Sequence, residues 1–377
     1  MENWKKWILR TLSYVLVAAV ASVATLVVSP RLTKLELLAT VIRNRFVEET
    51  DMTRLRDAAA TGMVASLGDR WSYYIPEDQY QAYDNNQSNR YVGVGITVMK
   101  REDGTGFEVQ SVTSGGPAEK AGLLAGDIIT HADGTELGPL DMTAMRSLIM
   151  GEKNTKVVLT VLRAGESMDF TVTRKSIHSV ATTGQMLPDQ IGLVTISNFH
   201  DDAGKETVKV IEDLVDQGAA ALILDVRDNP GGYTRELVEV LDYLLPEGPL
   251  FRSVTDGKEE VDMSDAKCLE LPMAVLMNGN SYSSAEFFAA ALSEYDWAVT
   301  VGEPTTGKAR FQITFTLGDG SAVNLSVGRY LTPNGVDLTE SGGLVPDISV
   351  EPAETAVMPE DDPQIQAAAA ALKASGT

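Results

Sequence analysis

The stretch NGNSYSSAEFFAAAL, residues 278–292, places a cluster of serines between an apolar segment and an apolar helical pattern. Ser281, Ser283 and Ser284 therefore lie where a strand would end and a helix would begin. The first turn of a helix presents unpaired backbone N–H groups, which stabilise an oxyanion if a nucleophile is held beside them. Serine is also among the best residues for capping a helix, and these serines alone favour that simpler role.

A nucleophilic serine needs a base, and no histidine lies between the serine cluster and the last residue, Thr377. A candidate base is Lys308, in the Gly- and Thr-rich segment GEPTTGKARFQITF at residues 302–315. A lysine accepts a proton only when neutral, so its pKa must fall from about 10.4 to about 7 to 8. Burial among apolar side chains and a nearby Arg310 would both act in that direction. Without such surroundings, a lysine in a loop is a solvated charge.

A third segment, LDVRDNPGG at residues 224–232, is an apolar strand that ends in a polar turn with two adjacent glycines. Gly231 and Gly232 allow the backbone to approach a ligand closely, and either could offer an N–H group to an oxyanion. A plain turn between a strand and a helix would use the same residues. The segment alone does not decide between these two roles.

The elements that must position these three segments alternate between strand and helix from Ile191 onwards. Continuous apolar strands at 191–197, 220–226 and 272–278 are separated by amphipathic patterns, including a helix expected over 203–216. This pattern is typical of an α/β layered core with a buried sheet. Paired strands are expected at 311–317 and 322–331, and the acidic, then Ala-rich tail predicts a short helix with a frayed end.

Two regions precede this core. Residues 31–89 show helical spacing, with Asp51 placed to cap a second helix, and they predict a small packing or dimerisation element. Residues 91–174 alternate as strands and predict a compact β-rich unit. Within it, Pro117 starts a short helix that ends at Gly122.

The N-terminal segment TLSYVLVAAVASVATLVVS, residues 11–29, carries no charge and is long enough to cross a bilayer as a helix. Basic residues and tryptophans precede it, as expected at a membrane interface: Trp4, Lys5, Lys6, Trp7 and Arg10. A cleaved signal peptide is the alternative, because 21–24 offers small residues. The length of the apolar run favours an uncleaved anchor.

The composition narrows the remaining functions. The chain has 377 residues and a formal net charge of −22, which disfavours binding to nucleic acid because the phosphates repel it. Its one cysteine, Cys268, permits neither an internal disulfide nor a Cys-rich metal site. The three histidines, His131, His178 and His200, are widely separated, so we expect no metal and no other cofactor.

Taken together, the three segments resemble the C-terminal processing peptidases, or tail-specific proteases, of the serine–lysine dyad type. The family's block Ser-Ala-Ser-Ala-Ser-Glu corresponds to SYSSAE, residues 281–286, which implies that Ser283 is the nucleophile. The family's block Gly-Lys-Gly-x-x-Gln corresponds to GKARFQ, residues 307–312, which implies Lys308 as general base and Gln312 as the residue that orients it.

The same resemblance assigns the oxyanion hole and a peptide-binding domain. LDVRDNPGG matches the family's strand-and-turn block, which implies an oxyanion hole formed by Gly231 or Gly232 together with Ser284. Residues 91–174 look like the family's PDZ domain, and GVGI resembles its carboxylate-binding loop: Gly93, Val94, Gly95 and Ile96. The likeness covers about 320 residues in the family's order, far more than one short motif.

Local departures from the family's pattern lie beside the catalytic positions. Tyr282 and Ala285 replace small and hydroxyl residues beside the nucleophile, Thr306 replaces a usual aromatic, and Ala309 replaces the glycine after the lysine. None of these changes removes a catalytic group. Tyr282 and Thr306 would reshape the entrance to the site and with it the substrate preference.

The resemblance implies a multidomain α/β protein with a crotonase-like layered peptidase core. The expected parts are a cytoplasmic stub and membrane helix at 1–30, a helical region at 31–89, the PDZ domain at 90–175, the core at 176–355 and a tail at 356–377. The implied activity is that of a membrane-anchored serine endopeptidase, which acts through an acyl-enzyme on proteins captured by their free C-termini. The catalytic part is expected outside the cytoplasm, with secretion after signal-peptide cleavage as the alternative. A homo-oligomer is left open.

Three other functions compete with this one. A PDZ scaffold with an inactive core would lack the serine, the lysine or the glutamine, and all three are present. A Ser-x-x-Lys acyltransferase would use SDAK at 264–267, which lies in a highly charged stretch without companion motifs. A Ser-His-Asp hydrolase would need one of the three histidines, and none lies in a matching motif.

Overall fold

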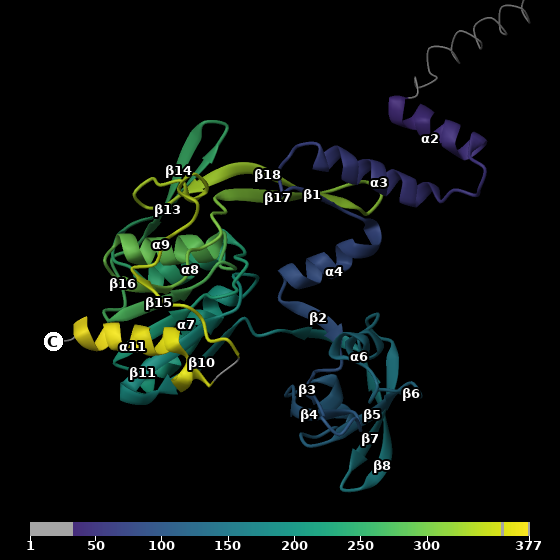
Figure 1. Ribbon diagram of the computed structural model, residues 1–377, viewed down its shortest axis with the longest axis horizontal. Coiled ribbons are helices and arrows are strands. Elements are labelled where there is room, and N and C mark those ends of the chain that lie inside the picture. The colour runs from purple at the N-terminus through teal and green to yellow at the C-terminus, as the bar shows by residue number, and fades with distance from the viewer. Residues whose placement is uncertain (1–32, 356–357, 376–377) are drawn as a thin grey trace, which may run out of the picture. The chain divides into compact units, whose positions relative to one another are not determined.

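The computed structural model describes residues 33–355 and 358–375 (Figure 1). The predicted membrane segment at 11–29 lies outside these residues. Within the described ranges, none of the helices combines the length and the apolar character that crossing a bilayer requires.

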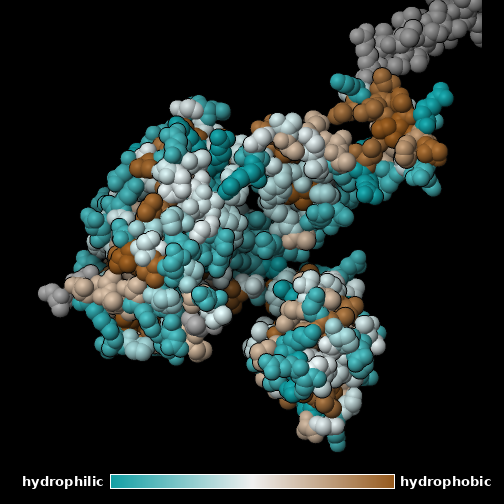
Figure 2. All heavy atoms as spheres, in the orientation of Figure 1, coloured by the Kyte–Doolittle hydropathy of each residue, from teal (hydrophilic) through white to brown (hydrophobic). Residues whose placement is uncertain are grey.

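The N-terminal unit contributes two helices, α2 (Lys34–Arg45) and α3 (Met52–Ala65). Thr33 and Glu36 cap the start of α2 reciprocally, and the Asp51 carboxylate accepts the N–H groups of Thr53 and Arg54. The predicted capping role of Asp51 is therefore confirmed. Neither helix has a buried residue, and apolar side chains gather on their surface (Figure 2): Leu35, Leu37, Leu38, Val41, Phe46 and Met63. The predicted packing or dimerisation role would use this surface.

The β-rich part follows β1 (Tyr73–Ile75) and α4 (Glu77–Gln87). Its sheet has the order β3-β4-β5-β7-β8, with the short β6 (Thr135–Glu136) beside β5. The strand bounds are Ile96–Lys100, Phe107–Val112, Ile128–Ala132, Lys156–Arg163 and Glu166–Thr173. The helices are α5 (Pro117–Ala121), which ends at Gly122 as predicted, and α6 (Met142–Ile149). A separate pair, β2 (Arg90–Gly93) and β9 (Lys175–His178), closes this part of the chain.

The core predicted at 176–355 is built on a six-stranded sheet of order β10-β11-β12-β15-β16-β19. The first pair is antiparallel and the remaining neighbours are parallel. The strands are Thr182–Leu187, Ile191–Ile196, Ala221–Asp225, Met273–Met277, Ala298–Gly302 and Ile348–Ser349, and η1 (Pro188–Gln190) joins the first two. The continuous apolar strands predicted from the sequence are confirmed by this arrangement.

Both faces of this sheet are covered, which explains why its strands are apolar throughout. Val194, Leu224 and Val275 belong to the core with α7 (Ala203–Asp216), α8 (Thr234–Leu244) and α9 (Ser284–Glu294). The alternate residues Leu193, Ile223 and Leu276 pack with α11 (Pro363–Ser375) on the opposite face. Figure 1 shows α8 and α9 on one side of the strands and α11 on the other.

A second, antiparallel sheet lies in the same part of the chain. Its strands include β13 (Gly248–Thr255), β14 (Lys258–Ser264), β17 (Arg310–Thr316) and β18 (Ala322–Leu331). The β17–β18 pair confirms the two strands predicted near the C-terminus. Two short helices complete the described chain, α10 (Leu338–Ser341) and η2 (Pro359–Asp361).

Candidate active site

The three chemical segments meet because the parallel strands bring their carboxyl ends to one edge of the sheet. Strands β12, β15 and β16 end at Asp225, Met277 and Gly302. The glycine pair, the serine cluster and Lys308 follow directly after these three ends. Ligands in open α/β sheets bind at this edge, so the topology itself assembles the candidate site.

Ser283 occupies an unusual backbone conformation between β15 and α9. Its φ is 59° and its ψ −126°, and its exposed fraction is 8%. An ordinary capping residue adopts an extended conformation. A non-glycine residue in this left-handed region costs about 1 to 3 kcal/mol and persists only when its surroundings enforce it. Ser283 is the N-cap residue of α9 and forms a capping box with Glu286, but capping does not require this positive φ.

Gly231 makes room for this conformation. Its φ is +86°, and a Cβ atom there would lie 2.8 Å from the Cβ of Ser283 and 2.9 Å from the nitrogen of Ser284. Only glycine fits this close approach without displacing the nucleophile.

A buried carboxylate joins the serine turn to the lysine loop. Glu286, in the first turn of α9, has no exposed surface and accepts four hydrogen bonds. The donors are the backbone N–H of Ser283 (2.9 Å), the hydroxyl of Thr305 (2.6 Å), and the N–H groups of Gly307 (2.6 Å) and Lys308 (2.7 Å). Four donors suit an ionised carboxylate, which has four lone-pair positions. Sequence reasoning missed this residue, although the spacing Ser-x-x-Glu is a known signal of a helix start.

The Lys308 amine lies over the ring of Tyr282. The distance from Nζ to the ring centroid is 5.4 Å, within cation–π range, and the Lys308 side chain is half-buried. Burial raises the pKa of the Tyr282 hydroxyl, so this side chain stays a neutral phenol near neutral pH. Tyr282, one of the departures from the family's pattern, therefore contacts the candidate base directly.

The two glycines of the predicted oxyanion hole are distinguished by their hydrogen bonds. The Gly231 N–H donates to Asn229 Oδ1 (2.8 Å) and its carbonyl accepts from the Phe199 N–H (2.8 Å). The Gly232 carbonyl accepts the Ser284 hydroxyl (3.0 Å), and a Cβ on Gly232 would collide with the Phe199 carbonyl at 2.1 Å. Because the Gly231 N–H is already engaged, Gly232 is the better candidate to share an oxyanion with Ser284.

The loops after β12 and β15 are hydrogen-bonded to each other along their length. The Ser281 hydroxyl donates to the Val226 carbonyl (2.7 Å), and the Tyr282 N–H donates to the Asn229 carbonyl (3.1 Å). The Asp228 carboxylate also accepts a hydrogen bond from the Asn280 side-chain amide (2.8 Å). The loop that carries the glycines is thus fixed against the loop that carries Ser283.

Gln312 lies on β17, next to a bulge between Phe311 and Gln312. Its side-chain amide donates to the Arg310 carbonyl (2.9 Å) and to the Ser326 hydroxyl (3.0 Å). The predicted role of Gln312 in orienting Lys308 stays a prediction.

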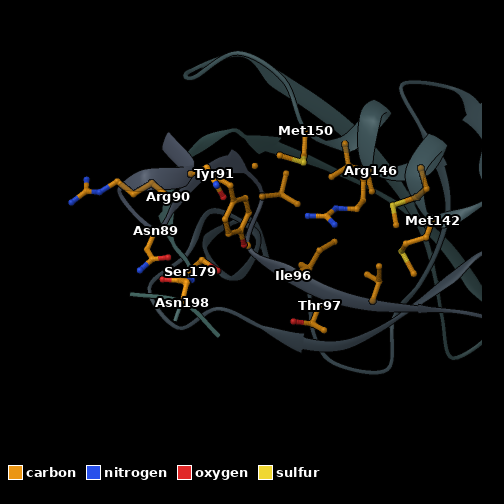
Figure 3. A pocket seen from close by; sticks show the side chains of 17 residues that line it. Asn89, Arg90, Tyr91, Ile96, Thr97, Met142, Arg146, Met150, Ser179 and Asn198 are labelled. Atoms are coloured by element: carbon orange, nitrogen blue, oxygen red, sulfur yellow. The ribbon is translucent and has the colours of Figure 1, made fainter. Parts of the chain in front are cut away.

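The residues of the predicted carboxylate-binding loop line a groove of about 470 Å³ in the β-rich part. Gly93 to Ile96 and the following strand β3 form one side, and Met142, Arg146 and Ile149 of α6 form the other. Figure 3 shows Arg146 reaching from α6 towards Tyr91. Burial raises the pKa of the Tyr91 hydroxyl, although Arg146 and Thr113 act in the opposite direction. The lining of the groove therefore includes two cationic side chains, Arg90 and Arg146, beside apolar and neutral polar ones.

The residues considered for an acyltransferase or for a Ser-His-Asp hydrolase make other contacts in the structure. The Ser264 hydroxyl of SDAK donates to the carbonyls of Pro246 and Gly248, and Lys267 is exposed. His178 pairs with Glu206. Within the described ranges, no group of three or more His, Cys, Asp or Glu side chains is arranged to hold a metal ion.

Comparisons with known proteins agree with this architecture. Residues 190–350 match the sequence pattern of peptidase family S41, residues 108–163 match a PDZ domain, and residues 17–79 match the "Activating protease CtpB N-terminal domain". A crystal structure of a putative S41 protease from Bacteroides fragilis NCTC 9343 has a TM-score of 0.56. It is 17% identical and covers 92% of this chain and 98% of that chain, so this likeness shows the fold.

Two curated relatives define the family more closely. The carboxy-terminal processing protease CtpA of Bacillus subtilis (strain 168) is 31% identical over 322 residues, which cover 84% of this chain and 68% of that protein. The probable CtpA-like serine protease of Staphylococcus aureus (strain N315) is 29% identical over 325 residues, or 85% of this chain. The chain spans 65% of the length of that S. aureus relative. The chain therefore belongs to peptidase family S41, among the CtpA-like C-terminal processing proteases with a PDZ domain.

Proposed function

We propose that this chain is a serine endopeptidase of the C-terminal processing type, with Ser283 as nucleophile and Lys308 as general base. The observation that carries the proposal is the backbone of Ser283, which is held in a strained conformation that a helix cap does not require. The Glu286 carboxylate supports it, because it binds the backbone of Ser283 and of Lys308 at once.

The reaction follows from these positions. As the Ser283 oxygen bonds to the peptide carbonyl carbon, its proton passes to the neutral amine of Lys308. The N–H groups of Gly232 and Ser284 stabilise the carbonyl oxygen as it becomes an oxyanion. The C–N bond then breaks, Lys308 returns the proton to the leaving amine, and an ester to Ser283 remains. Water, giving a proton to Lys308, hydrolyses this ester and restores the serine.

The groove in the PDZ domain is proposed to capture the substrate's C-terminus. Strand β3 is the edge strand of its sheet, so an extended peptide can pair with it while α6 covers the other side. The loop Gly93–Ile96 would receive the terminal carboxylate, and Arg146 adds positive charge to the groove. Protein substrates with a free and largely apolar C-terminus fit this chemistry.

Membrane attachment is also a proposal. Residues 11–29 would anchor the chain as one helix, with the PDZ domain and the peptidase part outside the cytoplasm. The test is fractionation of cells that express the full chain, followed by digestion of intact spheroplasts with an external protease. Recovery of the chain in the soluble fraction, or protection of the catalytic part from the external protease, would contradict this topology.

The activity is tested with purified full-length protein and an unfolded protein substrate, with cleavage mapped by mass spectrometry. We expect cleavage by the wild type and by Lys267→Ala, and none by Ser283→Ala or Lys308→Ala. The Lys267 variant is a matched lysine control and also tests the SDAK motif. A substrate with an amidated C-terminus should be cleaved more slowly than the same substrate with a free carboxylate. Cleavage by the Ser283→Ala protein would refute the proposed function.

A further inference from the structure

The C-terminal segment packs on the central sheet and contacts Arg227 in the loop after β12. The sequence predicts a short helix with a frayed end, and residues 359–375 lie beyond the 190–350 range that matches the peptidase family. In the structure, Ile365, Ala368 and Leu372 of α11 are buried against the central sheet. The start of this helix is therefore held at a fixed position near the ends of the strands.

Asp362 is the residue through which this helix start is fixed. One of its carboxylate oxygens accepts the backbone N–H groups of Gln364 (2.8 Å) and Ile365 (3.3 Å), as a helix-capping residue does. The other oxygen accepts a hydrogen bond from the Arg227 guanidinium at 2.8 Å. The same carboxylate thus binds both α11 and the loop after β12.

Gln364 makes a second connection of the same kind. Its side chain has no exposed surface, and its oxygen accepts from the same Arg227 nitrogen at 2.8 Å. Its amide nitrogen donates to the Val350 carbonyl at 2.8 Å. Because both polar atoms are engaged, the Gln364 side chain has one well-defined orientation.

Arg227 lies in the loop that carries the glycines of the oxyanion hole. Its other nitrogens bind both carboxylate oxygens of Asp225, at the end of β12, at 2.9 and 2.7 Å. The exposed fractions of the side chains are 18% for Arg227, 8% for Asp225 and 16% for Asp362. Charge-assisted hydrogen bonds in such poorly hydrated surroundings hold a side chain strongly, and a bidentate guanidinium fixes its direction.

The geometry points to Asp362 and Gln364 as positioning residues of the peptidase. Through Arg227 they hold the loop 226–232 so that the Gly232 N–H and the Ser284 N–H both point at the substrate's oxyanion. This inference rests on the proposed function. Asp362 lies 135 residues from Arg227 in the sequence and touches no group of the dyad in the contacts described above. The C-terminal segment therefore acts on the reaction through loop position alone.

The kinetic test compares Asp362→Asn with the wild type and with Asp361→Asn, which makes the same chemical change at an exposed neighbouring position. We expect Asp362→Asn to lower kcat at least tenfold, because misplacing or removing an oxyanion donor costs about 100- to 1,000-fold. KM for a short peptide should change less than threefold, and Asp362→Glu should recover part of kcat. A kcat for Asp362→Asn equal to that of Asp361→Asn, with only a lower Tm, would show that the contact is merely structural and would overturn the inference.

A second measurement does not depend on activity. In the Ser283→Ala background, hydrogen exchange at residues 226–232 should be faster in Asp362→Asn than in Asp361→Asn, while exchange in α7 stays unchanged. Equal exchange at 226–232 in the two variants would overturn the inference even if the wild type cleaved no substrate. If Ser283→Ala itself remained active, the proposed function would fail, and the exchange result would still decide the positioning role.

Discussion

The carboxylate of Glu286 binds the backbone of both Ser283 and Lys308, and Glu286→Gln removes its charge while keeping its size. Each carboxylate oxygen accepts two donors: one binds Thr305 and Gly307, the other Ser283 and Lys308. A glutamine keeps one oxygen. If its NH₂ group faces Ser283 and Lys308, both backbone N–H groups lose their acceptor; if it faces Thr305 and Gly307, the Gly307 N–H loses its acceptor and the Thr305 hydroxyl must turn to accept. The substitution therefore removes at least one hydrogen bond and places one N–H donor against another.

The magnitude follows from this count. A hydrogen bond to a charged group contributes about 1.5 to 3 kcal/mol, so the loss of one or two of them amounts to about 1.5 to 6 kcal/mol. This loss can appear as a lower free energy of unfolding, or as a movement of residues 305–308 away from Ser283. Movement of the lysine loop would lower kcat at least about a hundredfold, which corresponds to about 2.7 kcal/mol.

The assay measures kcat and KM on a short chromogenic peptide and unfolding by urea, for the wild type, Glu286→Gln and Glu294→Gln. Glu294 is the matched control, because it lies at the end of the same helix and its carboxylate accepts one backbone N–H, that of Asn334, at 2.7 Å. We expect Glu294→Gln to keep most of its kcat. If Glu286→Gln retained more than a tenth of the wild-type kcat and the same stability, the carboxylate would not couple the serine to the lysine loop.

Three further substitutions test separate parts of the same reasoning. Gly231→Ala should abolish cleavage, because the added Cβ would lie 2.8 Å from the Cβ of Ser283. The control Gly335→Ala has a similar φ of +84° and nothing within 4 Å, so it should lose only about 1 to 2 kcal/mol of stability and keep its activity. Equal activities of the two variants would contradict the close-approach argument. A cation–π contact of about 0.5 to 1 kcal/mol between Lys308 and the Tyr282 ring favours the protonated amine. Tyr282→Ala should therefore move the acidic limb of the plot of kcat/KM against pH to lower pH by about 0.4 to 0.7 pH units. Tyr282→Phe, which keeps the ring, should leave this limb unmoved. Burial lowers the pKa of His200 below its ordinary value of 6.5, so the unfolded chain binds the proton more readily and wild-type stability to urea should fall as pH drops below about 6.5. His200→Asn should flatten this decline, whereas His131→Asn should not. Identical dependence of stability on pH in all three proteins would contradict this reasoning.

The elements of the core could be predicted from the sequence because their signals are local. The helix expected over 203–216 is α7, Ala203–Asp216, since its apolar spacing is enough to define it. The approximate place of the site was also predictable, because segments after consecutive parallel strands meet at one edge. The hairpin β13–β14, with its charged and half-exposed strands, carries no comparable pattern and was not predicted.

The contacts that define the site could not be predicted because they join residues far apart in the sequence. Glu286 reaches the backbone of Lys308 across 22 positions, and Arg227 reaches Gln364 across 137. No periodicity records such pairs, since they depend on which loops the sheet brings together. The backbone conformation of Ser283 is likewise set by Gly231 and Glu286 rather than by its own residue type.

The arrangement around Glu286 addresses a problem that a lysine base creates. A carboxylate that bound the amine of Lys308 would stabilise the ammonium form, and a base in that form cannot take a proton from serine. In this structure the lone pairs of the Glu286 carboxylate are directed at one hydroxyl and three backbone N–H groups. Glu286 can therefore hold the Lys308 backbone close to the serine turn, while the Glu286 carboxylate accepts its hydrogen bonds from donors other than the Lys308 amine. A histidine base needs no such separation, because a carboxylate beside an imidazole favours the protonated form that the reaction itself produces.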